Sequence, residues 1–281
     1  DWFIFSGRLV GLKYFFNIEN KDENRKLFNG LYIENSPLIE EQGKYPVIFL
    51  SMKGISSAKF EDALDKIKDK ISNLYINYSF LMETLNEFEI DKFRDIAKGN
   101  TAQLESSLLF LSKLLYKYYN QKVVVLIDEY DSPIMSAYEK GYYSEMRDFL
   151  KAFYGDVLKT NEYLQMGVLT GIIRVAQAGI FSDLNNFISY TTLNDEYSQS
   201  FGLVEDEVKT MLDYYKIGYE MLEVKKWYDG YSFGKSDIYN PWSILNFVQF
   251  KELKSYWINT SSNFMIRELL EHTGEEGLKT L

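Results

Sequence analysis

The sequence contains no cysteine, and His272 is the single histidine among its 281 residues. Without cysteine, the chain cannot form disulfides or zinc–thiolate sites, and it has no thiol nucleophile. One histidine also disfavours metalloprotease sites and histidine-based triads. His272 lies within a glutamate-rich stretch, which is typical of a solvated helix end and not of a metal site. Catalysis by thiols or imidazoles is therefore not expected.

Long apolar runs are missing as well. No segment reaches 18 apolar residues, and the first residues do not have the layout of a signal peptide. We therefore expect a soluble, cytoplasmic protein without a membrane segment. The sequence starts at Asp1 and ends at Leu281, inside a charged, helix-like stretch. Both ends indicate a piece of a longer protein.

The composition is that of a folded acidic protein. Hydrophobic residues make up 46% of the chain, including 23 tyrosines and 20 phenylalanines, so a sizeable core is available. The length suits one large domain or two small ones. The net charge of −10 disfavours broad nonspecific binding of nucleic acid, although a local basic face stays open.

The most informative segment is Val123–Asp131, which reads VVVLIDEYD. Its five apolar residues predict a strand buried on both faces, as in parallel sheets. Carboxylates directly after such a strand lie where open α/β sheets bind ligands. Asp128 could hold Mg²⁺, and Glu129 could orient a water molecule for attack on a γ-phosphate, as in a Walker B motif. The alternative is a buried strand that runs into an acidic loop.

Helices and apolar strands alternate along the first 200 residues, which predicts an α/β fold with a parallel sheet flanked by helices. We expect a core at 1–200 and a smaller C-terminal part at 201–281, mainly helical or winged-helix-like. The aromatic residues of 227–239 favour a turn-rich packing segment over base stacking. Expected strands are 45–52, 123–127 and 163–170, and expected helices are 57–85, 101–119, 144–158, one starting near 204 and one starting at 241.

A phosphate-binding loop of the form G-x-x-x-x-G-K-[ST] should precede the acidic strand. Gly230–Ser236 ends in Gly-Lys-Ser, but its first glycine is one position too close, and the segment lies about 100 residues after the acidic strand. A tight aromatic turn explains it better. Ser6–Lys13 has the expected place in the chain and contains Gly7, Arg8 and Gly11, but it lacks Gly-Lys-Ser/Thr.

Thr170 and Arg174 follow the next predicted strand. A hydroxyl at that position can contact a γ-phosphate or its water, and an arginine one turn later can stabilise charge in the transition state. The alternative is a helix cap at Thr170 and a solvated arginine.

Taken together, these segments resemble the AAA-ATPase-like family of bacterial proteins, in which a nuclease-like domain of the PD-(D/E)XK type often follows. The resemblance covers about residues 12 to 265, with the segments in the family's order. The matching segments are 13–16, 28–33, 45–48, 125–134, 169–174, 180–186, 227–234 and 239–246.

The resemblance implies a P-loop NTPase fold with ATP and Mg²⁺ as ligands. Asp128 would be the Mg²⁺ carboxylate, Glu129 the water-orienting residue and Thr170 the sensor, with a looser role for Arg174. In the family, a Walker A loop of the form Arg-Arg-Phe-Gly-Lys-Thr occupies the place that Asp1–Gly11 takes here. Phosphate contacts would then fall to Gly7, Arg8 and Gly11.

Two functions follow as hypotheses. The first is ATP binding and Mg²⁺-dependent hydrolysis, and the second is a non-catalytic binding or scaffold module that has lost its nucleotide site. A nuclease-like domain in the longer protein, an oligomer and contact with nucleic acid stay open as partners. A Mg²⁺ nuclease within this chain is disfavoured, because no Asp followed after a short run by Glu-x-Lys falls on a predicted strand pair that would place two carboxylates and a lysine together.

Overall fold

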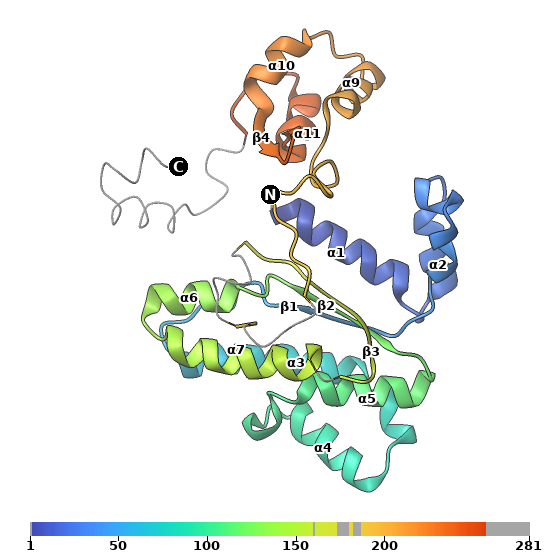
Figure 1. Ribbon diagram of the computed structural model, residues 1–281, viewed down its shortest axis with the longest axis vertical. Coiled ribbons are helices and arrows are strands. Elements are labelled where there is room, and N and C mark those ends of the chain that lie inside the picture. Colours follow the sequence, from blue (N-terminus) through green and yellow to red (C-terminus); the bar gives the residue numbers. More distant parts are fainter. Residues whose placement is uncertain (1, 160, 173–179, 182–186, 257–281) are drawn as a thin grey trace. The chain divides into compact units, whose positions relative to one another are not determined.

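The computed structural model describes residues 2–159, 161–172, 180–181 and 187–256 (Figure 1). The chain divides into two compact units, one over Trp2–Ser189 and the other from Tyr190 onward. The sequence analysis placed this boundary at about residue 200. Arg174 and the C-terminal stretch that contains His272 lie outside the described residues. None of the described helices is both long and apolar enough to cross a bilayer.

In the first unit, three described strands form a parallel sheet in the order β1–β2–β3. Their bounds are Val47–Ser51 for β1, Val123–Asp128 for β2 and Leu164–Leu169 for β3. β1 and β3 lie within segments predicted as strands, and β2 extends one residue beyond the predicted 123–127, so the expected parallel sheet is confirmed. The register places Ser51 beside Asp128 and Ile127 beside Leu169, so the carboxyl ends of all three strands meet at one edge.

Strand β2 is buried along its whole length, and its side chains alternate between two apolar clusters. Val124 and Leu126 pack with Leu9 of α1 (Trp2–Phe16) on one face. The other alternate residues of β2 face a larger core on the opposite side. Figure 1 shows helices on both faces of the sheet, with α1 on one side. The opposite side is covered by helices that include α3 (Phe60–Asn77), α5 (Ser107–Tyr119) and α7 (Tyr143–Leu158).

The helices form where apolar residues recur every three or four positions. In α5, Leu108, Leu111 and Leu115 are fully buried and share one stripe. The predicted helix at 57–85 is shorter in the structure, because α3 ends at Asn77 and a separate 3₁₀ helix, η4, follows. The other elements of this unit are α2 (Lys21–Arg25), η1 (Lys26–Phe28), η2 (Tyr32–Asn35), η3 (Pro37–Glu41), η4 (Ser79–Thr84), α4 (Glu87–Ala97), η5 (Thr101–Gln103) and α6 (Ser132–Lys140).

The second unit combines helices with a β-hairpin, and it has its own core. The segment 227–239, expected to be turn-rich, forms the end of a helix and an antiparallel hairpin. Its aromatic residues supply core packing through Tyr228 and Tyr239. The winged-helix-like character of this unit stays a prediction. Its elements are α9 (Glu205–Tyr214), α10 (Met221–Tyr228), β4 (Asp229–Phe233), β5 (Ser236–Tyr239) and α11 (Pro241–Phe250).

Candidate functional site

Three carboxylates lie at the carboxyl end of β2. Asp128 is the last residue of the strand, and Glu129 and Asp131 follow within three positions. All three are buried, with residue exposures of 5%, 3% and 0%. Since β2 lies between β1 and β3, its carboxyl end lies between the ends of both neighbours. In open α/β sheets this is the edge at which ligands bind.

Asp128 is joined to Thr170 by a hydrogen bond. The Thr170 hydroxyl donates to Oδ1 of Asp128 at 2.7 Å. The backbone sets this contact, because the N–H of Thr170 donates to the carbonyl of Ile127 at 3.0 Å. On the other side, the N–H of Met52, just after β1, donates to the carbonyl of Asp128 at 2.8 Å. The structure therefore brings together two predicted site residues that are 42 positions apart in sequence.

Glu129 has an unusual backbone and an unusual environment. Its φ of 55° lies in the left-handed region, which is uncommon for a residue with a side chain. Its buried Oε1 accepts no hydrogen bond from any described residue, and the nearest cation is Lys53 Nζ at 3.9 Å. The pKa of Glu129 is raised to about 7, first by burial and then by the neighbouring carboxylates of Asp128 and Asp131, while the charges of Lys53 and Lys70 act to lower it. A carboxylate that titrates near neutrality suits proton transfer or the orientation of water.

Lys53 is a site residue that the sequence analysis missed. It follows β1 by two positions, and its side chain is 72% exposed while its ammonium group approaches the buried Glu129. Nothing in its local sequence distinguishes it from other surface lysines. A lysine just beyond a strand that neighbours the acidic strand is the signal that could have found it, because the carboxyl ends of parallel strands share an edge.

A second link joins the loops after β2 and β3. Oδ2 of Asp131 accepts a hydrogen bond from the N–H of Ile172 at 2.6 Å, and the N–H of Tyr130 donates to the carbonyl of Thr170 at 3.0 Å. Gly171 lies between these two contacts. A Cβ there would be 2.5 Å from a ring carbon of Tyr130 and 2.8 Å from the carboxyl carbon of Asp131. The close approach of the two loops therefore requires a glycine.

Gly7, Arg8 and Gly11, the predicted phosphate contacts, lie in a helix and not in a loop. All three belong to α1, which runs without a break from Trp2 to Phe16. The apolar residues of this stretch favour a helix docked on the sheet, as the burial of Leu9 shows. Amides in the interior of a helix bond to carbonyls one turn earlier, so they are not available to surround a phosphate. Nucleotide contacts from these three residues stay a prediction.

The near match to a phosphate loop at Gly230–Ser236 covers most of β4, the turn at Gly234 and Lys235, and the first residue of β5. Gly234 has a φ of 52°, and its N–H donates to the carbonyl of Thr192 at 2.8 Å. Lys235 forms an ion pair with Asp195 at 2.8 Å. The prediction of a tight turn is confirmed here, and the amide and the ammonium group are both engaged within the second unit.

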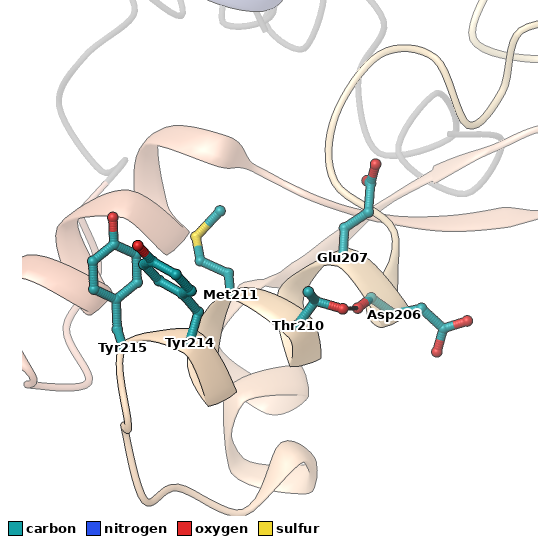
Figure 2. A pocket seen from close by; sticks show the side chains of 6 residues that line it. All are labelled: Asp206, Glu207, Thr210, Met211, Tyr214 and Tyr215. Carbon is teal, nitrogen blue, oxygen red and sulfur yellow. Dashed lines mark hydrogen bonds between the residues drawn. The ribbon is translucent and has the colours of Figure 1, made fainter. Parts of the chain in front are cut away.

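A shallow depression along α9 is a further candidate site (Figure 2). Two of its polar side chains form hydrogen bonds to the backbone in or next to α9. The Glu207 carboxylate accepts the N–H of Val204 at 3.0 Å, and the Thr210 hydroxyl donates to the carbonyl of Asp206 at 2.8 Å. The described lining residues include no lysine or arginine to meet a phosphate, so this depression is not assigned to a nucleotide. The lining residues are Asp206, Glu207, Thr210, Met211, Tyr214 and Tyr215.

With this geometry established, comparison with known proteins identifies the family. The family of predicted AAA-ATPases, named AAA-ATPase-like, matches residues 7–181, more than half of the chain. The chain belongs to the AAA-ATPase-like family. This confirms the resemblance found from the sequence, and the matched range contains the β2 carboxylates, Thr170 and the Asp131–Ile172 contact.

A curated relative of this AAA-ATPase-like chain is an uncharacterized protein in the vnfD 5′ region of Azotobacter chroococcum mcd 1. The two are 27% identical over 248 residues, which cover 88% of this chain and 44% of the relative. The chain therefore spans less than half the length of the curated relative that it matches. No solved structure matches the chain.

Proposed function

We propose that this AAA-ATPase-like chain binds ATP and hydrolyses it in a Mg²⁺-dependent reaction at the carboxyl end of β2. The observation that carries the proposal is the hydrogen bond from Thr170 to Asp128 beside the buried Glu129. It unites an acidic residue, a hydroxyl and a second carboxylate at the edge of the sheet where such chemistry is done in α/β proteins. Membership of the family supports the same assignment.

The residues present fit a magnesium ion. Mg²⁺ prefers oxygen ligands and is usually held by one or two carboxylates together with water and substrate phosphates. Asp128 offers a carboxylate that the Thr170 hydroxyl orients. No group of three or more acidic or histidine side chains in the described ranges is arranged to hold a metal ion. We therefore assign the ion to Asp128, with the remaining ligands supplied by water and nucleotide.

Each remaining residue has a role that its position supports. Glu129 would orient the attacking water, because its Oε1 accepts no hydrogen bond from any described residue and its pKa lies near neutrality. Thr170 would hold Asp128 in place and contact the γ-phosphate or its water. Lys53 would provide a positive charge beside Glu129. The bound Mg²⁺ would neutralise charge that develops on the phosphate oxygens.

A second function, a binding or scaffold module without catalysis, is favoured by one observation. Residues 7–11 form part of helix α1, where the family has its phosphate loop. Backbone amides and a lysine of such a loop supply much of the binding energy for phosphates. A chain that kept the sheet and lost this loop would retain the fold without turnover.

Calorimetric titration of the 281-residue chain with Mg-ATP separates these two functions. We expect saturable binding that Asp128→Ala abolishes, because that substitution removes the proposed metal ligand. Asp91→Asn, an exposed acidic position on α4, serves as the matched control and should bind like the parent. Absence of heat from the parent, with circular dichroism showing a folded chain, would reject ATP binding and favour the scaffold function.

A further inference from the structure

We propose that Asp131 is a positioning residue that ties the loop after β3 to the loop after β2 and thereby holds Thr170 against Asp128. This inference rests on the proposed ATPase function and deepens it. The motif that suggests the function assigns roles to Asp128 and Glu129 and leaves Asp131 without one. The geometry gives Asp131 a separate task.

Asp131 departs from the usual behaviour of an aspartate at the start of a helix. It occupies the N-cap position of α6, where the side chain ordinarily accepts from an N–H in the first turn of its own helix. No such bond is formed. Its carboxylate instead accepts the N–H of Ile172, 41 positions further along the chain, at 2.6 Å. The side chain is thus used between loops and not within the helix.

Two hydrogen bonds join the residues that follow β3 to the residues that follow β2, one on each side of Gly171. Tyr130 donates its N–H to the carbonyl of Thr170, and Ile172 donates its N–H to Asp131. One bond has its donor after β2 and the other has its donor after β3, so the three residues 170–172 are held at their first and last positions. Moving the backbone of Thr170 away from Asp128 would strain or break at least one of these bonds.

Because Asp131 is buried, its carboxylate requires polar partners. Asp131 is fully buried, and a carboxylate taken out of water is tolerated only when polar groups meet it. A hydrogen bond from a backbone N–H to a carboxylate is among the stronger kinds. The main chain of Asp131 is also fixed, because its carbonyl accepts the N–H of Met135 in α6 at 3.0 Å. The acceptor for Ile172 is therefore anchored to a helix.

The space around Gly171 shows that the two loops approach closely. The position of a Cβ on Gly171 would overlap the Tyr130 ring and the Asp131 carboxyl group. A loop that merely passed nearby would not need this approach. We call this contact between Asp131 and Ile172 the brace. It consists of a buried acceptor and a backbone donor, and Gly171, which has no side chain, lies next to the donor.

The test compares Asp131→Ala with Asp131→Asn in the full chain. Asn keeps an oxygen that can accept from Ile172, and Ala removes it. We measure kcat and KM for Mg-ATP and the amide hydrogen exchange of Ile172. For Asp131→Ala we expect kcat to fall by about tenfold or more, because a displacement of about 1 Å can cost two orders of magnitude in rate. KM should change less than kcat does, since Asp131 itself is assigned no contact with the nucleotide.

Exchange at Ile172 should become about tenfold faster in Asp131→Ala, which corresponds to the loss of one hydrogen bond. Asp131→Asn should restore both kcat and protection to within about threefold of the parent. If Asp131→Ala does not fold, Ile172→Pro removes the same bond from the donor side and should lower kcat in the same way. Asp91→Asn is the control for loss of an acidic side chain at an exposed site.

Unchanged kcat and unchanged Ile172 protection in Asp131→Ala would overturn the proposal. An Asn variant as impaired as the Ala variant would overturn it too, because the acceptor would not be what matters. Absence of ATP turnover in the parent would reject the proposed function. In that case the exchange rate of Ile172 alone decides whether the brace between the loops exists.

Discussion

Glu89 of α4 shows how a single carboxylate can carry several contacts. It closes a capping box, in which its side chain accepts the N–H of Asn86 and the Asn86 side chain accepts the N–H of Glu89. It also accepts from Lys117 at 2.7 Å and lies 3.5 Å from Lys113. Burial alone would raise the pKa of Glu89, but the hydrogen bonds from Lys117 and Asn86 and the two lysine charges hold it below its usual value.

A lowered pKa in the folded state means that ionised Glu89 stabilises the fold. This contribution is complete above the pKa of the unfolded chain and is lost as the pH falls through the lower, folded value. We expect Glu89→Gln to lose about 1 kcal/mol of stability near neutral pH, because the charge-assisted hydrogen bond is gone. Below about pH 4 the difference should shrink.

Urea unfolding of the parent and Glu89→Gln at several pH values checks this prediction. Glu87→Gln, in the first turn of the same helix and exposed, is the matched control. A stability difference between Glu89→Gln and the parent that stays constant from neutral to acidic pH would contradict the role of the ionised group.

At the scale of elements, α1 is held to the sheet by a small apolar cluster. Leu9 is 1% exposed and packs with Val124 and Leu126 of β2. Substitution of a buried leucine by alanine removes apolar contacts and leaves a cavity. We expect Leu9→Ala to destabilise the first unit by about 2–5 kcal/mol in chemical unfolding. Leu27→Ala, where the leucine is 57% exposed, should change stability by less than about 0.5 kcal/mol.

An equal effect of the two leucine substitutions would show that α1 is not docked on the sheet. The comparison also bears on the phosphate contacts expected from Gly7, Arg8 and Gly11. A docked α1 presents these residues on a fixed helix, whereas a loosely held segment could adopt a loop.

The strands of the parallel sheet and the helices α3, α5 and α7 were predictable because their patterns are local. The apolar run of β2 and the leucine stripe of α5 need no information beyond their own residues. Short α4 and α6 were missed. Capping defines α4 more clearly than periodicity does, and α6 starts inside the acidic motif. The β4–β5 hairpin was hidden because both strands are short and β4 is rich in turn residues.

The site was partly predictable for a topological reason. Asp128 and Thr170 end neighbouring parallel strands, so their meeting follows from the sheet alone. The approach of Lys53 to Glu129 could have been inferred from its place just beyond β1. The contact of Asp131 with Ile172 depends on how individual loops turn, and the sequence carries no signal for that. The left-handed backbone of Glu129 is likewise visible only once the chain is folded.

At the scale of the whole molecule, the two units have separate cores. Phe247 is fully buried in the core of the second unit, and Leu115 is fully buried in that of the first. We expect Phe247→Ala to speed amide exchange throughout the second unit and to leave the first unit near parent rates. Leu115→Ala should have the opposite pattern. Equal acceleration of both units by either substitution would show that they unfold together.

The left-handed backbone of Glu129 has a consequence for engineering this protein. A side chain in that conformation costs on the order of 1 kcal/mol, and a buried carboxylate adds to the cost. Glycine or asparagine would adopt the same turn with less strain. A library selected only for survival at high temperature would therefore enrich those residues at position 129 and discard the acidic group. Thermal stability therefore favours glycine or asparagine at position 129, whereas the proposed chemistry requires glutamate.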